Sequence, residues 1–216
     1  MNPPQKSAVS RNRRAHEKQR AMGSVIDAAL DAFGRHGYAG ASLSQIAEAA
    51  GLTKATVVHH FGSKEELWKA AVDALFASVD ARMAALQGDL PEPLVPRLHA
   101  VLRSYFEICL DHPAYVRIPM LEGEHHSWRS EWIAKRHLSR HLATFARFTQ
   151  RLVTAKVLPD VEPLQLQNLI TAPLQYFLMQ RDLVSAATGH NQTPQEYFEH
   201  YWETLEKLLI REAMPG

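Results

Sequence analysis

Apolar residues recur every three or four positions along most of the chain, which is the spacing of one face of an α-helix. Near the N-terminus, Ile26, Ala29 and Phe33 follow this spacing, and Gly37 stands where a left-handed residue can end a helix. No segment alternates apolar and polar residues between turn pairs, as a β-hairpin would require. The pattern therefore predicts an all-α fold whose first helix covers residues 17–36.

Two short helices follow, and local signals mark their ends. Ser42 and Gln45 have the spacing of a capping box, so we expect the second helix to begin at Ser42. Gly51 can adopt positive φ without a Cβ penalty and should end it. Thr53 then caps a third helix over residues 54–61. These signals predict two helices joined by a turn of about three residues.

The rest of the chain continues in longer helices. Ser63 and Glu66 form a second capping-box pattern, which opens a helix over residues 64–86. The segment QGDLPEPLVP then breaks the chain near residue 88. Thr193 and Glu196, with proline between them, open the last helix. Further helices are predicted at residues 93–111, 113–122, 127–157, 162–184 and 194–212.

This pattern suggests four segments along the chain. They are a basic flexible arm (1–16), a domain of three short helices (17–64), a connecting helix (65–87) and a larger helical domain (88–216).

Charge and cysteine content narrow the class of protein. Residues 1–64 hold nine Lys/Arg and four Asp/Glu, whereas residues 65–216 hold fifteen and nineteen, so the positive charge lies at the front. The single cysteine, Cys109, excludes an internal disulfide framework and suits a reducing compartment. Residues 163–180 are uncharged but too rich in polar residues and proline for a membrane span. We expect a cytoplasmic protein without a membrane segment.

The two short helices have the form of a helix-turn-helix, whose second helix enters a DNA major groove. A small residue such as Ala55 allows close approach to bases, Thr56 offers a hydroxyl, and Val58 suits a thymine methyl. Lys64 opens a helix whose free N–H groups already favour a phosphate. The residues expected on the outward side of this second helix are Lys54, Ala55, Thr56, Val58 and His60.

Other interpretations of this stretch remain open on the pattern alone. LTKATVVHHF would also suit an ordinary amphipathic helix of a bundle, with solvated histidines. A metal site at His59 and His60 is disfavoured, because adjacent side chains on a helix point about 100° apart. In the N-terminal arm, Arg13 and Arg14 can follow phosphates or enter a minor groove, whereas residues 1–10 suit a solvated tail.

One longer stretch, LSQIAEAAGLTKATVVHHFGSKEEL, resembles the DNA-binding domain of the tetracycline-repressor (TetR) family of transcriptional regulators. Phe33, Gly37 and Tyr38 also match that family's pattern at the end of the first helix. The family usually has an aromatic residue where this chain has Val58, which changes the expected operator sequence. By this resemblance, the positions that meet DNA are Ser44, Gln45, Lys54, Ala55, Thr56, Val58, His60 and Lys64.

The last two helices have wide apolar surfaces with aromatic residues, which are typical of a symmetric interface. The alternative is an intramolecular core. The TetR resemblance implies a homodimer built by these helices. A dimer would place two recognition helices on half-sites about 34–36 Å apart in a pseudo-palindromic operator. The residues assigned to the interface are Leu166, Ile170, Leu174, Phe177, Tyr197, Tyr201, Trp202, Leu205 and Leu208.

A second group of aromatic residues suggests a small-molecule pocket, although the same pattern is more often plain core. The resemblance implies that this domain senses an effector whose identity the sequence does not reveal. The expected result of effector binding is release of a repressor from its operator. The candidate lining is Leu102, Tyr105, Phe106, Met120, Trp128, Trp132, Phe145, Phe148 and Phe177.

The histidines offer one competing function. His137 and His141 lie at i and i+4, and with Glu124 and His125 they could hold a metal in a hydrolase or a metal sensor. However, HLSRH lacks the glutamate that a zinc-hydrolase helix supplies as general base, and no other catalytic motif occurs. We therefore predict neither an enzyme nor a cofactor, with polar or solvated histidines as the default.

Overall fold

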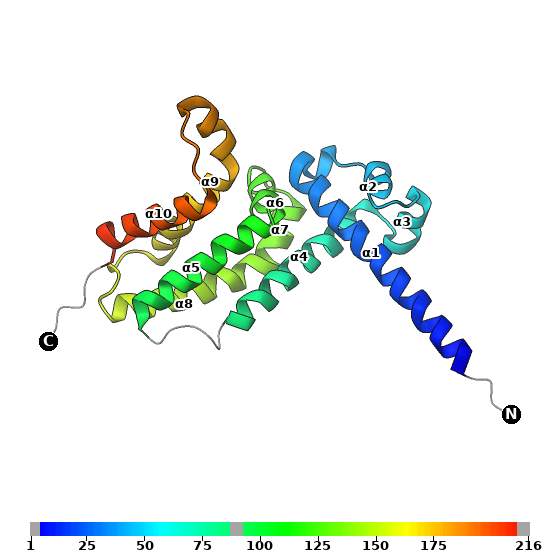
Figure 1. Cartoon of the computed structure of the whole chain (residues 1–216), viewed down its shortest axis with the longest axis horizontal. Helices are drawn as coiled ribbons and strands as arrows, with labels where there is room; N and C mark the ends of the chain where they lie inside the picture. Colours follow the sequence, from blue (N-terminus) through cyan, green and yellow to red (C-terminus); the bar gives the residue numbers. More distant parts are fainter. Residues whose placement is uncertain (1–4, 87–92, 211–216) are drawn as a thin grey trace. The chain divides into compact units, whose positions relative to one another are not determined.

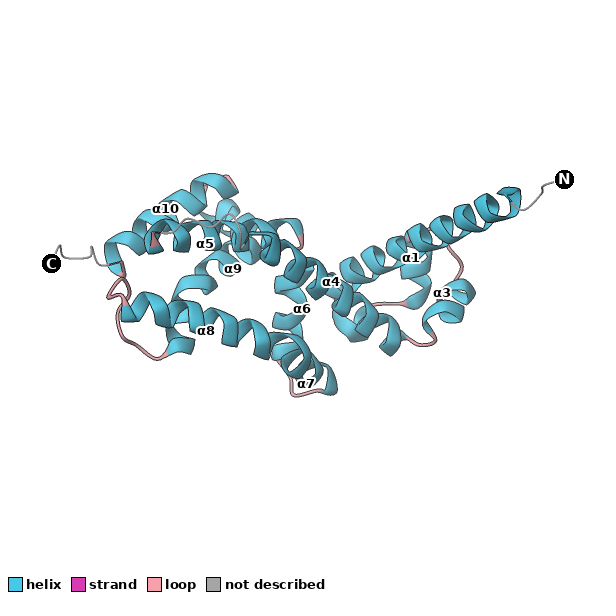
Figure 2. Ribbon diagram, turned by 90° about the horizontal axis from the view of Figure 1, so that it is seen from below, coloured by secondary structure: helices cyan, strands magenta, loops and turns pink. Residues whose placement is uncertain are grey.

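The computed structural model describes residues 5–86 and 93–210, with side chains for Arg13 and from His16 onward. Within these ranges every regular element is helical, which confirms the predicted all-α class (Figure 2). The elements are α1 (Gln5–Gly40), α2 (Leu43–Ala49), α3 (Lys54–Phe61), α4 (Lys64–Leu86), α5 (Leu94–Asp111), α6 (Ala114–Gly123), α7 (Trp128–Ile133), a π-helical turn η1 (Ala134–Leu138), α8 (Ser139–Thr154), α9 (Pro163–Thr188) and α10 (Pro194–Leu208).

The chain divides into two compact units, Met1–Ser78 and Val79–Gly216. In the N-terminal unit, α1 packs on α2 and α2 packs on α3, as Figure 1 shows. Burial on the inner faces of these helices and of the first turns of α4 is nearly complete. The buried residues include Val25, Ala29, Phe33, Ile46, Ala47, Val57, Leu67 and Trp68.

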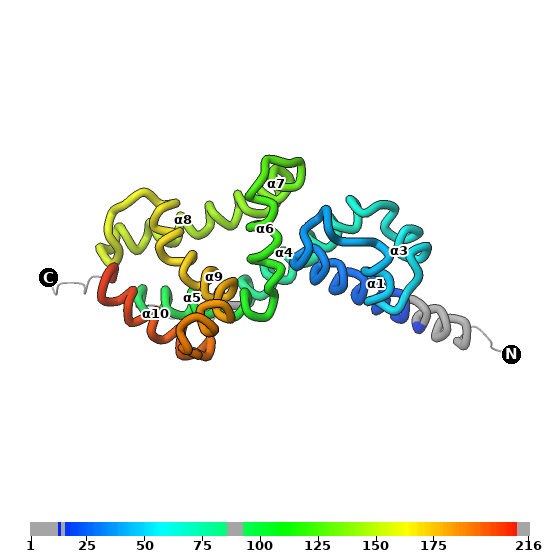
Figure 3. The backbone as a smooth tube through the Cα atoms, turned by 90° about the horizontal axis from the view of Figure 1, so that it is seen from above, coloured from blue at the N-terminus to red at the C-terminus, as the bar shows by residue number. Residues whose placement is uncertain are grey.

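In the C-terminal unit, α9 is the central element, because it packs against both α5 and α8, and α10 packs on α5 (Figure 3). Side chains from these four helices form one hydrophobic cluster. Its most deeply buried members are Leu98, Leu102, Phe106, Leu152, Leu166, Ile170, Leu174 and Phe198.

Two tyrosine hydroxyls within this cluster bond carbonyl groups close to a proline inside α9. Pro173 has no N–H, so the carbonyl of Leu169 loses its usual helical donor. The Tyr201 hydroxyl of α10 donates to the Ile170 oxygen at 2.5 Å and lies 3.4 Å from the Leu169 oxygen. The Tyr197 hydroxyl donates to the Pro173 oxygen at 2.9 Å. Two tyrosines of α10 thus satisfy carbonyl groups around the proline.

One acidic and one basic residue in the last turns of α4 form ion pairs with neighbouring helices. The Asp80 carboxylate accepts a hydrogen bond from Arg140, and its Oδ1 lies 2.6 Å from Nε2 of His141. Arg140 and His141 both belong to α8. Two residues after Asp80, Arg82 pairs with Asp111 and with Glu107 of α5. A negative and a positive group of α4 therefore contact different helices of the C-terminal unit.

The observed helices differ from the expected ones at several ends. Helix α1 begins at Gln5 rather than at residue 17, and α9 continues to Thr188, where Gly189 (φ 69°) ends it. The helix expected over residues 127–157 is divided by η1, in which the N–H of Ser139 reaches back five residues to the Ala134 carbonyl. The last helix ends at Leu208, and residues 211–216 lie outside the described range.

None of the helices in the described residues combines the length and the apolar character needed to cross a membrane.

Candidate nucleic-acid interface

The turn between α2 and α3 is closed by backbone hydrogen bonds around Gly51. The Gly51 N–H donates to the Glu48 oxygen at 3.0 Å, and the Leu52 N–H donates to the Ala47 oxygen at 2.8 Å. This pair of bonds is the Schellman arrangement, which requires a left-handed residue, and Gly51 has φ 70°. A Cβ at this glycine would meet nothing within 4 Å, so the need for glycine is conformational rather than steric.

Side-chain caps fix where the two helices begin. Oγ1 of Thr53 accepts from the Thr56 N–H at 3.2 Å and lies 2.9 Å from the Thr56 hydroxyl. The predicted N-cap at Thr53 is therefore confirmed. Ser42 also caps α2, but its Oγ accepts from the Ser44 N–H at 3.3 Å, so the expected capping box with Gln45 does not form.

Helix α3 has a buried side and an exposed side. Val57 is 1% exposed and belongs to the core of the N-terminal unit. Thr56 is half-buried, whereas Val58 is 38% exposed despite its apolar side chain. The other exposed residues of the expected DNA-facing set are Ser44, Gln45, Lys54, Ala55 and His60. The structure therefore brings the predicted α2 and α3 residues together on one small helix pair.

The two histidines occupy the last turn of α3. Both are exposed, and their rings lie 5.2 Å apart at 68°. The sequence of α3, KATVVHHF, contains no acidic residue.

Lys64 links the start of α4 to the end of α1. Its Nζ lies 3.4 Å from the Ala39 oxygen and 4.7 Å from the centre of the Tyr38 ring. The expected cap at Ser63 is present, because Ser63 Oγ accepts from the Glu66 N–H at 3.1 Å. These contacts hold Lys64 at the first turn of α4, where helical N–H groups favour an anion.

The two acidic groups close to this turn share one cation within α4. Lys69 donates to Glu65 at 2.7 Å and to Glu66 at 3.2 Å, and these hydrogen bonds raise the pKa of Lys69. In the arm, Arg13 is exposed and bonds Glu17 at 2.9 Å. The side chain of Arg14 lies outside the described residues.

The residues of the predicted effector pocket lie in different surroundings. Leu102 and Phe106 are packed in the core, and Phe145 and Phe148 lie against it. Met120 and Trp128, in contrast, are 40% and 38% exposed. Trp128 and Trp132 lie under the guanidinium groups of Arg129 and Arg136. Tyr105 bonds Gln175 at 2.5 Å, and burial raises its pKa. Helical spacing does not distinguish a buried aromatic residue from an exposed one, so the sequence could not separate these residues.

Most of the residues assigned to a dimer interface belong to the core of the single chain. Tyr197 and Tyr201 are half-buried with their hydroxyls bound to α9, and Leu208 is 75% exposed. The remaining six have exposures of 8% or less, which leaves them little surface for a second chain: Leu166, Ile170, Leu174, Phe177, Trp202 and Leu205.

Helix α9 has an apolar strip on its outer side that was not predicted from the sequence. Leu169, Tyr176 and Leu183 are 55%, 61% and 67% exposed. They are seven residues apart, so they lie along one side of the helix. This repeat could have been found in the sequence, but it runs beside the stronger buried pattern of Leu166, Ile170 and the residues that follow.

The structure gives the metal alternative no support. Among the described residues, no three His, Cys, Asp or Glu side chains lie close enough to hold a metal ion. His141 uses one ring nitrogen for Asp80 and the other for the Tyr115 hydroxyl at 3.1 Å. Glu124 and His125 are exposed, whereas His137 is buried.

Comparison with known proteins agrees with this geometry. The model of the family described as "Bacterial regulatory proteins, tetR family" matches residues 25–71, which include all of α2 and α3.

Similarity to individual proteins extends over different lengths. RaaS, a helix-turn-helix transcriptional regulatory protein of Mycobacterium tuberculosis, is 42% identical over 39% of this chain and 40% of its own length. The transcriptional regulator RutR of Escherichia coli is 26% identical over 97% of both chains. A TetR transcriptional regulator from Chloroflexus aurantiacus has the same fold, with a TM-score of 0.69 and 22% identity over 91% of this chain and all of that one.

Proposed function

We propose that the chain is a transcriptional regulator of the TetR family, and that it is a dimeric repressor released from its operator by a small molecule. The observation that carries the DNA-binding part is the α2–α3 pair, closed at Gly51 and capped at Thr53. It leaves an exposed side of α3 that has one lysine, two histidines and no acidic group. Such a surface suits the negative edge of a duplex.

We assign the side chains of α3 different roles at the DNA. Lys54 and His60 reach phosphates or base edges, and Ala55 allows the helix to approach closely. Thr56 is held by Thr53, which fixes the direction of its hydroxyl toward a base. Val58 contacts a thymine methyl, in keeping with its exposure. Direct reading of bases thus falls to two or three residues.

Residues on the elements around α3 contact phosphates. We assign these contacts to Ser44 and Gln45, which are exposed on α2, and to Lys64 at the start of α4. Arg13 and Arg14 of α1 add contacts along the backbone. Because phosphate contacts carry no sequence information, these residues set affinity and salt dependence rather than operator choice.

Dimerisation is supported by the apolar strip of α9. Leu169, Tyr176 and Leu183 are large apolar side chains that stay exposed in the single chain. Exposed apolar rows of this kind mark interfaces in soluble proteins. We therefore move the proposed interface from the buried side of α9 to this strip, and keep the exposed Leu208 of α10 from the residues first assigned. Two chains related by a two-fold axis would then read two half-sites.

The proposed effector response uses α4. This helix runs without interruption from Lys64 to Leu86, so it belongs to both units. Its Asp80 and Arg82 are paired with α8 and α5. A ligand that shifts α5 or α8 would therefore act on α4 through these pairs. Differential affinity of 5- to 150-fold, about 1–3 kcal/mol, is enough for such coupling.

The test of DNA binding is a titration of the protein on a labelled fragment of its own upstream region, with nonspecific competitor and at several salt concentrations. We expect competitor-resistant binding that the double variant Thr56→Ala/Lys64→Ala abolishes. Lys64→Ala alone should reduce the slope of log K against log salt by about one for each chain.

A matched control removes the same kinds of group elsewhere. Thr144→Ala/Arg147→Ala deletes one exposed hydroxyl and one exposed cation that bond each other in α8. This variant should bind DNA as the wild type does. Equal loss in both double variants would contradict the assignment of the interface to α3. If the wild type binds neither this fragment nor any sequence selected from genomic DNA, the proposal fails.

A further inference from the structure

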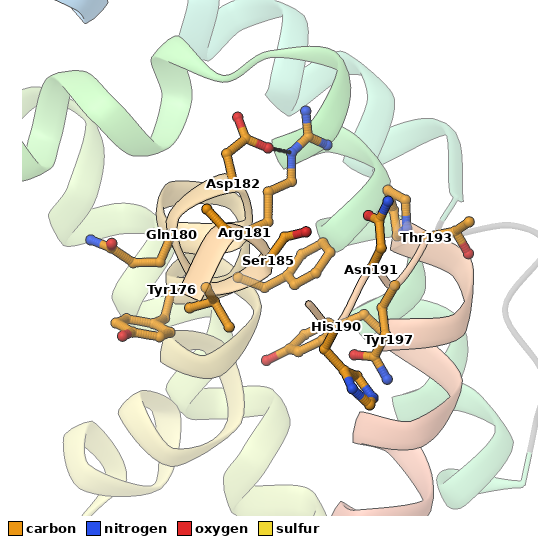
Figure 4. A pocket seen from close by; sticks show the side chains of 14 residues that line it. Tyr176, Gln180, Arg181, Asp182, Ser185, His190, Asn191, Thr193 and Tyr197 are labelled. Carbon is orange, nitrogen blue, oxygen red and sulfur yellow. Dashed lines mark ion pairs between the residues drawn. The ribbon is translucent and has the colours of Figure 1, made fainter. Parts of the chain in front are cut away.

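A cavity lies at the C-terminal end of α9, and all but one of the residues that the sequence assigned to an effector lie outside its lining. It has a volume of about 820 Å³, which is within the range of small-molecule sites. Figure 4 shows Tyr176, Arg181 and Ser185 extending from α9, with Asn191 on the facing connection and Tyr197 on helix α10. Tyr176 also belongs to the exposed strip that we propose as the dimer interface. Phe177 is the one residue of the expected effector lining that takes part.

One wall of the cavity is aromatic and rigid. The rings of Phe177 in α9 and Tyr197 in α10 stack with centroids 4.0 Å apart and planes at 16°. The Tyr197 hydroxyl is already bound to the Pro173 oxygen, and burial raises the pKa of Tyr197, which keeps it neutral. One face of the Tyr197 ring is covered by Phe177, so Tyr197 offers a ligand the remaining apolar surface of its ring rather than a charge or a proton.

The connection between α9 and α10 is held in place by its own hydrogen bonds. The Gly189 N–H donates to the Ser185 oxygen at 2.9 Å, and the His190 N–H donates to Oγ1 of Thr188 at 3.1 Å. Gln192 lies 3.1 Å from Nδ1 of His200, and Thr193 forms a reciprocal capping box. Because these bonds order the wall in advance, a ligand would not need to order it on binding.

The remaining lining residues are mostly polar. The charges of the two ionised ones, one arginine and one aspartate, cancel. Arg181 and Asp182 pair with each other, with Nε and Oδ1 3.3 Å apart. The other polar groups are amides, hydroxyls and one imidazole, from Gln180, Ser185, His190, Asn191, Gln192 and Thr193. This combination suits hydrogen bonds to a neutral molecule rather than an ion pair.

We propose that this cavity binds an uncharged, flat aromatic molecule that stacks beside Tyr197 and Phe177 and forms hydrogen bonds through its edge. Aromatic pairs prefer such stacked or edge contacts, which add to the burial of apolar area. The site deepens the proposed effector response and rests on it for its biological meaning. Binding itself is measured without DNA, so failure of one proposal leaves the other standing.

The probe is Nile red, a neutral planar dye whose fluorescence responds to polarity, titrated with full-length protein. Saturable binding of one dye per chain is expected. Ser185→Trp fills the cavity from α9 and should weaken binding at least about tenfold. Its matched control is Ala143→Trp, which adds the same ring at an exposed place on α8 and should bind within about twofold of the wild type.

Two further comparisons test the chemistry. Tyr197→Phe keeps the ring and should retain binding, whereas Tyr197→Leu should weaken it at least about tenfold. Circular dichroism measures whether both variants fold. If Tyr197→Leu does not fold, the Ser185→Trp variant still tests whether the dye binds in the cavity. Cresyl violet, a cation with a related ring system, should bind more weakly than Nile red because no unpaired anion is among the lining residues described.

Several results would overturn the proposal. They are absence of saturable Nile red binding, undiminished binding to Ser185→Trp, or equal affinity for the cationic dye. Binding that disappears as the protein concentration rises would also overturn it, because a second copy of the chain would then fill the cavity.

Discussion

In the N-terminal unit, Ile46 and Val57 face inward while the outer side of α3 is mostly polar. In the C-terminal unit, α9 buries Ile170 on one side and exposes Leu169 on the other. The first pattern suits a helix pair that meets water and a charged duplex. The second suits a helix that packs in its own chain and also against another apolar surface. Apolar residues on two sides of one helix therefore indicate two different contacts.

The largest expected effect compares one phenylalanine from each unit. Phe33 and Phe198 are each 1% exposed. Truncation of either to alanine should lower the free energy of unfolding by about 3–5 kcal/mol, because a cavity remains in the core. Chemical denaturation followed by circular dichroism measures this loss. Phe33→Ala should also abolish DNA binding. A loss below about 1 kcal/mol at either site would contradict the observed packing.

The next effect compares two glycines of the N-terminal unit. Gly51→Ala forces an alanine to φ 70° and should destabilise the protein by about 1–2 kcal/mol. Gly23→Ala, at an exposed position within α1 where a Cβ meets nothing, should stabilise it by about 0.5–1 kcal/mol. Thermal unfolding of the two variants checks the opposite signs. Equal shifts would mean that the left-handed turn at Gly51 does not form.

A smaller effect compares the N-caps of the two units. Thr53→Ala and Thr193→Ala each remove a hydroxyl that accepts from a helical N–H, and each should cost about 1 kcal/mol. Only Thr53→Ala should also weaken operator binding, because Thr53 holds Thr56. The serine variant at each position should restore most of the stability. Equal weakening of DNA binding by Thr193→Ala would contradict the separate roles.

The smallest effect concerns alkaline pH and the C-terminal unit. Burial raises the pKa of Cys109 to about 12, against 9.0 for a free thiol. Between these values the folded state keeps a proton that the unfolded state has lost, so stability falls as pH rises. The loss from this group should stay below about 1 kcal/mol at pH 9.5. Denaturation of wild type and Cys109→Ala at pH 8 and 9.5 measures it, and an unchanged pH dependence in the variant would exclude the thiol.

Local signals predicted much of the fold. Helices α3 and α4 have the bounds expected from Thr53, Ser63 and the turn glycines, because a cap acts within one turn of the chain. The capping box at Thr193 also forms as predicted. The π-helical turn η1 was not foreseen, since the residues on either side of it continue the same helical pattern.

The candidate DNA-binding surface was also within reach of the sequence. Lys54, Val58 and His60 are exposed as the spacing from Val57 requires, because one short helix has one buried side. Their contacts with DNA stay a prediction. The surroundings of the expected effector lining could not be predicted from helical spacing, because they depend on contacts with distant or exposed groups. Trp128 lies under an arginine, whereas Phe106 packs against Phe198.

By itself, the sequence determined the all-α class, the turn at Gly51 and the resemblance of residues 20–68 to a DNA-binding domain. Helical periodicity, caps and positive φ depend on neighbours a few residues away, which the sequence displays directly. Only the tertiary structure decided which apolar residues are core and which remain exposed on α9. It also placed Tyr197 beside Phe177 at a cavity, because contacts between residues twenty positions apart depend on how whole helices pack.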